Sequence, residues 1–184
     1  MFEDLLEKIA RALDRADIPY MLIGGQALLL YGEPRLTRDI DITLGISTNQ
    51  LHRLLSVVDE MGLKPLADPW DFTVKTMVLP CQYPTVDIRI DFIFSFSPYE
   101  SQAILRANRV AIGSSRVNFA SPEDLIIHKV FAGRPRDLED VKSVLLKNKD
   151  LDRKYIRRWL KDLSESLNEP LVRKFNTLVK EVDG

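Results

Sequence analysis

The sequence is poor in the residues that build thiolate and imidazole metal sites. One cysteine, Cys81, and two histidines, His52 and His128, occur in 184 residues. A single cysteine excludes an intramolecular disulfide and a thiolate metal cluster. Two histidines are too few for a histidine-based zinc site. Any metal ion that this chain binds is therefore expected on oxygen ligands.

Long apolar runs are absent as well. No run in the sequence approaches the roughly 20 apolar residues that a membrane-spanning helix needs. The first 15 residues mix charged and apolar side chains, without the continuous apolar centre of a secretion signal. The net charge is −1, and 45% of the residues are hydrophobic, which is enough for a core. We expect a cytoplasmic protein with no membrane partner.

Hydrophobic periodicity predicts an α+β fold with a mixed β-sheet. Strands are expected at residues 19–25, 38–45, 71–80 and 85–96, with a hairpin at 109–120. Helices are expected at residues 2–16, 26–32, 48–61, 121–133, 135–148, 151–166 and 169–182. This pattern predicts a core of sheet and flanking helices over residues 1–120, followed by a helical region, 121–184, packed on the core.

The segment IGGQALLLYGEPRLTRDIDITL, residues 23–44, combines features that suit a phosphate. A short buried strand ends at Gly24 and Gly25, and a helix follows directly. Without side chains, these glycines let the backbone approach a phosphate, and the start of the helix aims N–H groups at it. Arg35 and Arg38 follow, and each can hold phosphate oxygens by forked hydrogen bonds.

Three aspartates fall on the polar faces of expected strands. Asp39 and Asp41 are two residues apart in one strand, and Asp91 belongs to another. If these strands are neighbours, the carboxylates converge on one spot. Mg²⁺ prefers such oxygen ligands and usually shares them with substrate phosphates, and two such ions can promote an in-line displacement. Asp87 lies on the same face as Asp91 and is the alternative third carboxylate.

The strand, the Gly-Gly pair, the helix and the D-x-D pair resemble the signature of the nucleotidyltransferase fold of DNA polymerase beta-like enzymes. The R-x-T-x-D-x-D form at residues 35–41 is similar to that of AbiEii-type proteins, the toxin halves of type IV toxin–antitoxin pairs. SPEDLIIHKVFAGRPRDLEDV, residues 121–141, resembles the second block of that group, a helix lysine followed by R-x-[KR]-D-x-x-D.

The resemblance implies a nucleotidyltransferase fold and a role for each residue of the first motif. Asp39 and Asp41 would bind two Mg²⁺ ions, and Asp91 would be the third carboxylate, acting on the incoming hydroxyl. Gly24 and Gly25 would cradle the triphosphate of an NTP, with Arg35 and Arg38 beside it.

The second motif carries implied roles as well, each with a simpler alternative. Lys129 would contact the phosphates and neutralise charge that develops on them, or it is a solvated helix residue. Asp137 would act as a base or orient Arg134 or Arg136. Surface ion pairs of Asp137 and Asp140 with the nearby Arg136 and Lys142 explain these carboxylates almost as well.

A basic stretch lies in the C-terminal part of the chain. Residues 147–161 hold seven basic and two acidic side chains. On the expected helix, the basic residues form one stripe, which consists of Arg153, Lys154, Arg157, Arg158 and Lys161. Such a stripe is commonly a solvated face, but beside a nucleotidyl-transfer site it can bind the phosphates of an RNA acceptor.

Together these patterns predict a Mg²⁺-dependent enzyme that moves a nucleoside monophosphate from an NTP to an acceptor. RNA such as tRNA is the first expected acceptor, and a toxin-like role with a cognate antitoxin protein follows from the resemblance. An antibiotic-modifying enzyme, which needs an acidic pocket for cationic drugs, is the nearest alternative. A protein-modifying nucleotidyltransferase and a non-catalytic nucleotide-binding module are the others.

Overall fold

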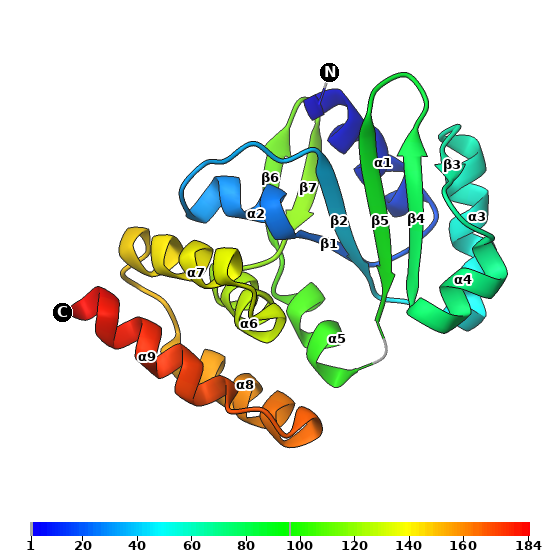
Figure 1. Cartoon of the computed structure of the whole chain (residues 1–184). Coiled ribbons are helices and arrows are strands. Elements are labelled where there is room, and N and C mark those ends of the chain that lie inside the picture. The colour runs from blue at the N-terminus through cyan, green and yellow to red at the C-terminus, as the bar shows by residue number, and fades with distance from the viewer. Residues whose placement is uncertain (1, 96) are drawn as a thin grey trace. The chain divides into compact units, whose positions relative to one another are not determined.

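A computed structural model describes residues 2–95 and 97–184 (Figure 1). The chain forms two compact units. The first comprises Met1–Ile23 and Thr37–Phe119, and the second comprises Gly24–Leu36 and Ala120–Gly184. Among the described residues, no helix has the length and apolar character needed to cross a membrane.

The first unit is built on a seven-stranded mixed sheet with the order β3-β4-β5-β2-β1-β7-β6. Its strands are β1 (Tyr20–Ile23), β2 (Asp39–Leu44), β3 (Lys64–Pro65), β4 (Val78–Tyr83), β5 (Ile88–Phe94), β6 (Asn108–Ile112) and β7 (Ser115–Phe119). Strand β2 lies between β5, to which it is parallel, and β1, to which it is antiparallel. Strands β6 and β7 form the predicted hairpin. The α+β class and the mixed sheet predicted from the sequence are confirmed.

Helices flank this sheet. They are α1 (Phe2–Arg15), α3 (Leu51–Glu60), which follows a 3₁₀ turn at Thr48–Gln50, α4 (Pro69–Thr76) and α5 (Pro98–Leu105). Helix α1 packs against β6, β7 and α3. Its residues Ile9 and Leu13 are fully buried, as are Ile40, Ile42 and Phe92 of the central strands. The core of this unit therefore lies between the sheet and the apolar stripes of its helices.

The second unit is wholly helical. It consists of α2 (Gly24–Tyr31), α6 (Pro122–Ala132), α7 (Pro135–Lys147), α8 (Arg153–Leu167) and α9 (Leu171–Asp183). Helix α6 contacts all four of the others. Ser121 is its N-cap, and the Ser121 hydroxyl accepts a hydrogen bond from the backbone N–H of Asp124. The four helices predicted after residue 120 are confirmed, with ends that differ by a few residues.

The strand predicted at residues 71–80 is wrong in its first half. Residues 69–76 form α4, and only Val78 onward joins the sheet as β4. Asp68 caps this helix by accepting from Asp71 N–H at 2.7 Å, and Pro69 stands at its first position. Met77 then adopts a left-handed conformation, φ 62°, and ends the helix. The capping signals outweigh the β-branched residues between them.

Other elements differ from the prediction as well. Helix α5 was not predicted, although Ser97 caps it and Pro98 opens it, as Ser121 and Pro122 do for α6. Helix α2 begins at Gly24, two residues earlier than predicted. Gly24 has φ 64°, a value that glycine adopts without the steric cost other residues incur.

Candidate active site

Parallel pairing of β2 and β5 brings the predicted carboxylates to one face of the sheet. Asp41 is the Cα partner of Asp91, and Asp39 is the partner of Arg89. Paired residues of parallel strands point to the same face. The intervening Ile40 is fully buried on the opposite face, while Asp39 is exposed and Asp41 and Asp91 are half-buried. Figure 1 shows β2 and β5 side by side.

Asp87, the alternative to Asp91, lies outside this arrangement. It precedes β5, in the turn that joins β4 to β5, and its side chain is exposed. Its carboxylate accepts from Gln82 Nε2 at 3.1 Å. Register therefore pairs Asp41 with Asp91 and leaves Asp87 four residues away along the chain.

Arg89 belongs to the carboxylate face, a role that sequence reasoning did not assign. Its Nε donates to both carboxylate oxygens of Asp91, at 2.8 and 3.0 Å. The hydrogen bond to Asp91 raises the pKa of Arg89, and the charges of Asp91, Asp39 and Asp41 add to the rise against the effect of burial. The signal was present in the sequence, because Arg89 alternates with Ile88 and Ile90 in phase with Asp91.

The chemistry of these donors fits Mg²⁺, since the face offers carboxylate oxygens and no sulfur or imidazole nitrogen. Over residues 2–95 and 97–184, however, no group of three or more His, Cys, Asp or Glu side chains is arranged to hold a metal ion. Asp91 is turned to Arg89 instead. Asp39 and Asp41 fit the ion by type, and the three-carboxylate site stays a prediction.

The glycine pair lies next to this face in the chain. Ile23, the last residue of β1, is the Cα partner of Asp41. Gly24 follows and opens α2, whose first turn holds the buried Gly25 and Gln26. The first N–H groups of a helix have no partner within that helix. The sequence thus joins a helix start directly to the strand position opposite Asp41.

Lys129 and the second motif form a buried ion-pair network in the second unit. The Lys129 side chain is 6% exposed, and its Nζ donates to Asp137 Oδ1 at 3.0 Å and Asp140 Oδ2 at 2.8 Å. Arg134 donates to Asp137 at 2.6 Å. Arg35 reaches Asp140 through two nitrogens, at 3.0 and 3.3 Å. Three basic residues therefore share two buried carboxylates.

This network corrects the simpler alternatives from the sequence. Lys129 is not a solvated helix residue, and Asp137 and Asp140 are buried rather than paired at the surface. Burial alone would raise the pKa of Asp137, but hydrogen bonds from Arg134 and Lys129 outweigh it and lower the pKa. Arg134, one of the two partners predicted for Asp137, donates to its carboxylate at 2.6 Å, and an orienting role for Asp137 stays a prediction.

Comparison with known proteins settles the class of this chain. A family model described as "Nucleotidyltransferase of unknown function (DUF6036)" matches residues 1–182. The chain belongs to this family. Its enzyme class, a nucleotidyltransferase, is the one predicted from the Gly-Gly and D-x-D motifs.

Solved structures of other nucleotidyltransferases share the fold. The antibiotic-resistance factor ANT(2″)-Ia matches with a TM-score of 0.62 at 19% identity, over 90% of this chain and 94% of that chain. An antigenic nucleotidyltransferase-like protein from Paracoccidioides brasiliensis matches with a TM-score of 0.56 at 17% identity, over 97% and 91% of the two chains. The lincosamide antibiotic adenylyltransferase LnuA, bound to lincomycin, matches with a TM-score of 0.50 at 14% identity, over 72% and 89%. No curated protein matches the chain.

The basic residues predicted to bind the acceptor divide into two pairs on α8 of this nucleotidyltransferase. Arg153 pairs with Asp183 of α9 at 2.6 Å. Arg157 donates to Asn176 at 2.9 Å. Lys154 and Arg158 are exposed, with Arg158 lying over the Trp159 ring. Arg153 and Arg157 thus help to join α8 to α9, whereas Lys154 and Arg158 face solvent.

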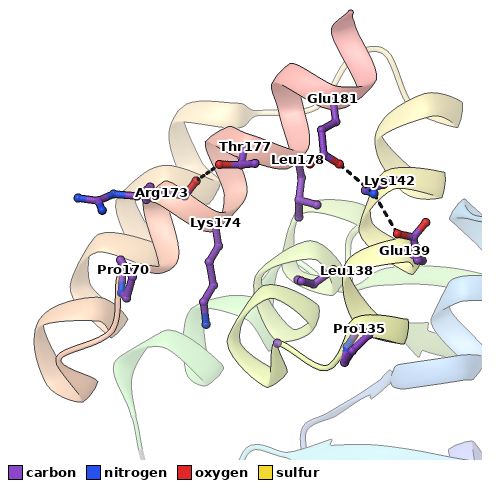
Figure 2. Close-up of a pocket in the computed structure, with 11 residues that line it drawn as sticks. Pro135, Leu138, Glu139, Lys142, Pro170, Arg173, Lys174, Thr177, Leu178 and Glu181 are labelled. Carbon is purple, nitrogen blue, oxygen red and sulfur yellow. Dashed lines mark hydrogen bonds and ion pairs between the residues drawn. The ribbon is translucent and has the colours of Figure 1, made fainter.

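A pocket of about 480 Å³ lies within the second unit of the nucleotidyltransferase, between α7 and α9. Figure 2 shows Leu138 and Leu178 side by side in it, with Lys142 between Glu139 and Glu181. The Lys142 Nζ lies 2.9 Å from Glu139 and 2.8 Å from Glu181. None of its lining residues was predicted as a site residue.

Proposed function

We propose that this nucleotidyltransferase moves a nucleoside monophosphate from an NTP to an acceptor hydroxyl in a Mg²⁺-dependent reaction. One observation carries the proposal: Asp41 and Asp91 are Cα partners on adjacent parallel strands, with Asp39 on the same face. Register supports Asp91 over Asp87 as the third carboxylate. The acceptor oxygen forms a bond to the α-phosphorus, the bond to the bridging oxygen breaks, and pyrophosphate leaves with that electron pair.

Each residue of the first unit has a distinct task in this proposal. Asp39 and Asp41 would hold the magnesium ions, which when bound neutralise charge on the phosphates. Asp91 takes the proton of the acceptor hydroxyl, once its carboxylate is released from Arg89. Arg38 is exposed and directly precedes Asp39 in the chain, and it binds a phosphate oxygen.

The glycine pair and the second motif have proposed tasks as well. Backbone N–H groups at Gly24 and Gly25 bind the triphosphate. The buried network supports a positioning role for Lys129 and Asp137: with Asp140 they fix Arg35, which stands four residues before Asp39 in the chain. Arg35 then offers its guanidinium to the phosphates from a defined position.

We propose RNA, such as tRNA, as the acceptor. The exposed Lys154 and Arg158 of α8 support it, since cations on a solvated helix face attract phosphates. As in the AbiEii-type proteins that the motifs resemble, the enzyme would act as the toxin of a type IV pair in the cytoplasm, with a cognate antitoxin protein. Growth arrest on expression, relieved by Asp41→Ala, is the matching cellular test.

A small cationic antibiotic is the second candidate acceptor. The structural match covers 94% of the ANT(2″)-Ia chain. A structure of that protein contains adenylyl-2″-tobramycin. That likeness concerns the fold. A drug acceptor would need an acidic pocket, and the carboxylate face carries Arg89 beside its three aspartates.

The deciding experiment supplies each of four α-³²P-labelled NTPs with Mg²⁺ and either total cellular RNA or a panel of aminoglycosides and lincosamides. Label in a tRNA-sized band supports the RNA acceptor and identifies the nucleotide, and label on a drug supports the alternative. Asp91→Ala should abolish transfer, whereas Asp87→Ala, a matched change in the exposed turn, should retain it. Loss in Asp87→Ala alone would overturn the assignment of Asp91, and absence of label on every acceptor would overturn the proposed activity.

A further inference from the structure

A second hollow, of about 550 Å³, lies between α8 and α9 on the surface of the second unit. Most of its lining side chains are polar or basic, namely Lys161, Ser164, Arg173, Asn176, Thr177 and Lys180, and Pro170 and Val172 border it as well. Figure 2 shows the Arg173 side chain pointing away from Leu138 and Lys142 of the first pocket. We call this hollow the α8–α9 groove.

The groove carries positive charge that the protein itself does not neutralise. Lys161, Arg173 and Lys180 are exposed, and none of them forms an ion pair within the described parts of the chain. Glu165 is the single acidic residue in the lining. Three cations around one anion attract a ligand that carries several negative charges.

Neighbouring basic residues on the same helices behave differently. Arg153 pairs with Asp183 at 2.6 Å, and Lys174 pairs with Glu169 at 3.1 Å. These two basic residues thus form ion pairs with carboxylates of the same unit, whereas, among the described residues, Lys161, Arg173 and Lys180 do not. The excess charge is local to the groove and does not follow from the net charge of −1.

Spacing along α9 fits a polymer of phosphates. Arg173, Asn176 and Lys180 stand on successive turns of α9. At a rise of 1.5 Å per residue, Arg173 and Lys180 are about 10 Å apart along the helix axis. A nucleic-acid strand rises about 3.4 Å per nucleotide, which makes that length equal to about three nucleotides.

A hydrogen-bond donor lies between the two cations. Arg157 donates to the Asn176 Oδ1 at 2.9 Å and lies 5.6 Å from the centre of the Phe175 ring. Because Arg157 holds the oxygen of this amide, its NH₂ group is the end that can donate to a phosphate. Arg157 also adds a fourth positive charge beside the groove.

The apolar residues of the two helices argue against a lipid surface. Ile156, Leu160, Leu171 and Phe175 are all fully buried. A helix that lies in a membrane interface needs its apolar face for the acyl chains. Here that face is used within the unit, and only the basic, polar side remains for a partner.

We propose that the α8–α9 groove binds the phosphate backbone of the RNA acceptor through Lys161, Arg173 and Lys180, with Arg157 and Asn176 beside them. The inference rests on the proposed nucleotidyl transfer to RNA. It extends the acceptor contact from the exposed Lys154 and Arg158 of α8 to residues of both helices. The contact positions the RNA and reads no sequence, because phosphates are the same at every nucleotide.

The test measures binding of a fluorescein-labelled 20-nucleotide oligouridylate and of bulk tRNA, without NTP. The Lys161→Gln/Arg173→Gln/Lys180→Gln variant is compared with Lys64→Gln/Lys75→Gln/Arg116→Gln, which removes the same charge from exposed sites of the first unit. Circular dichroism melts check that both variants fold. We expect the groove variant to bind about tenfold more weakly than wild type, with the control within about twofold. The slope of log K against log salt should fall by about 2 for three lost phosphate contacts on a single strand.

Three results would overturn the inference. The two triple variants could lose RNA affinity equally, or the groove variant could lose none. The third is that the groove variant loses as much affinity for a polyglutamate 20-mer as for RNA. Label transfer is scored separately, with wild-type protein. Transfer to RNA together with an unaffected groove variant defeats the groove and leaves the proposed function standing. Groove-dependent RNA binding without any transfer defeats the proposed function and leaves the groove.

Discussion

Asp41 and Asp91 are direct neighbours across the parallel strands β2 and β5, yet the Asp91 carboxylate is bound by Arg89 of its own strand at 2.8 Å. The acidic face thus contains its own counter-cation. Arg89 holds the charge of Asp91 in place while no other cation binds there, and it competes with any cation that does.

Arg89→Gln should tighten the binding of a divalent cation about threefold. The variant removes a positive charge beside Asp39, Asp41 and Asp91, but the Arg89 side chain is 51% exposed and solvent screens much of its charge. Titration with Mn²⁺, followed by electron paramagnetic resonance, measures the change. Arg116→Gln, at an exposed position of β7, serves as the matched control. Unchanged or weaker binding in Arg89→Gln would contradict the competition.

Lys129→Met should destabilise the protein strongly. The variant leaves Asp137 and Asp140 buried without the cation that they share, and removal of one partner from a buried pair costs about 3–5 kcal/mol. Urea denaturation gives the free energy of unfolding. Lys142→Met, at a more exposed lysine that also contacts two carboxylates, should stay near wild type. Similar losses in the two variants would mean that burial of the Lys129 network adds nothing.

Asp137 should make the stability depend on pH in the acid range. Its pKa is lower in the folded protein than the ordinary value of 3.8. The ionised carboxylate therefore adds stability above that value, and the contribution is lost as the pH falls through the lowered pKa. The difference in unfolding free energy between wild type and Asp137→Asn should be largest at pH 7 and shrink below about pH 4. A difference that stays constant down to pH 2.5 would refute this origin.

Asp140→Asn should loosen the segment before β2. Arg35 lies in a stretch without helix or strand, residues 33–38, and Asp140 is the residue that its guanidinium binds. A neutral amide cannot accept the forked, charge-assisted pair in the same way. Hydrogen–deuterium exchange should therefore be faster over residues 33–38 than in wild type, and unchanged in Asp162→Asn on the exposed side of α8. Equal exchange in all three proteins would show that Arg35 is not the anchor.

The local pattern of the sequence predicted most of the elements because their signals are local. The alternation of Asp39, Asp41, Arg89 and Asp91 with isoleucines defined β2 and β5, and Ser121 with Pro122 defined the start of α6. The same logic failed at residues 71–76, where Thr73 and Val74 suggested a strand. There the cap at Asp68 and the stop at Met77 decided for a helix.

Membership of the site followed from the sequence only in part. Spacing and resemblance named Asp39, Asp41 and Asp91, because their chemistry is readable residue by residue. Whether Asp87 or Asp91 lies opposite Asp41 depends on the register between β2 and β5. These strands are separated by 43 residues of the sequence, and no local signal fixes their register.

Tertiary structure alone decided the environments of the charges. A lysine on a predicted helix looks the same in sequence whether it faces water or a core, and α6 is buried on nearly every side, so its pattern gave no polar face to read. Packing of α6 against α7 placed Lys129 between Asp137 and Asp140, where desolvation makes the pairing obligatory. The sequence by itself determined which side chains are present and which of them have the chemistry that the proposed reaction needs. Only the packing of distant helices and strands determined which of them face solvent and which neutralise one another.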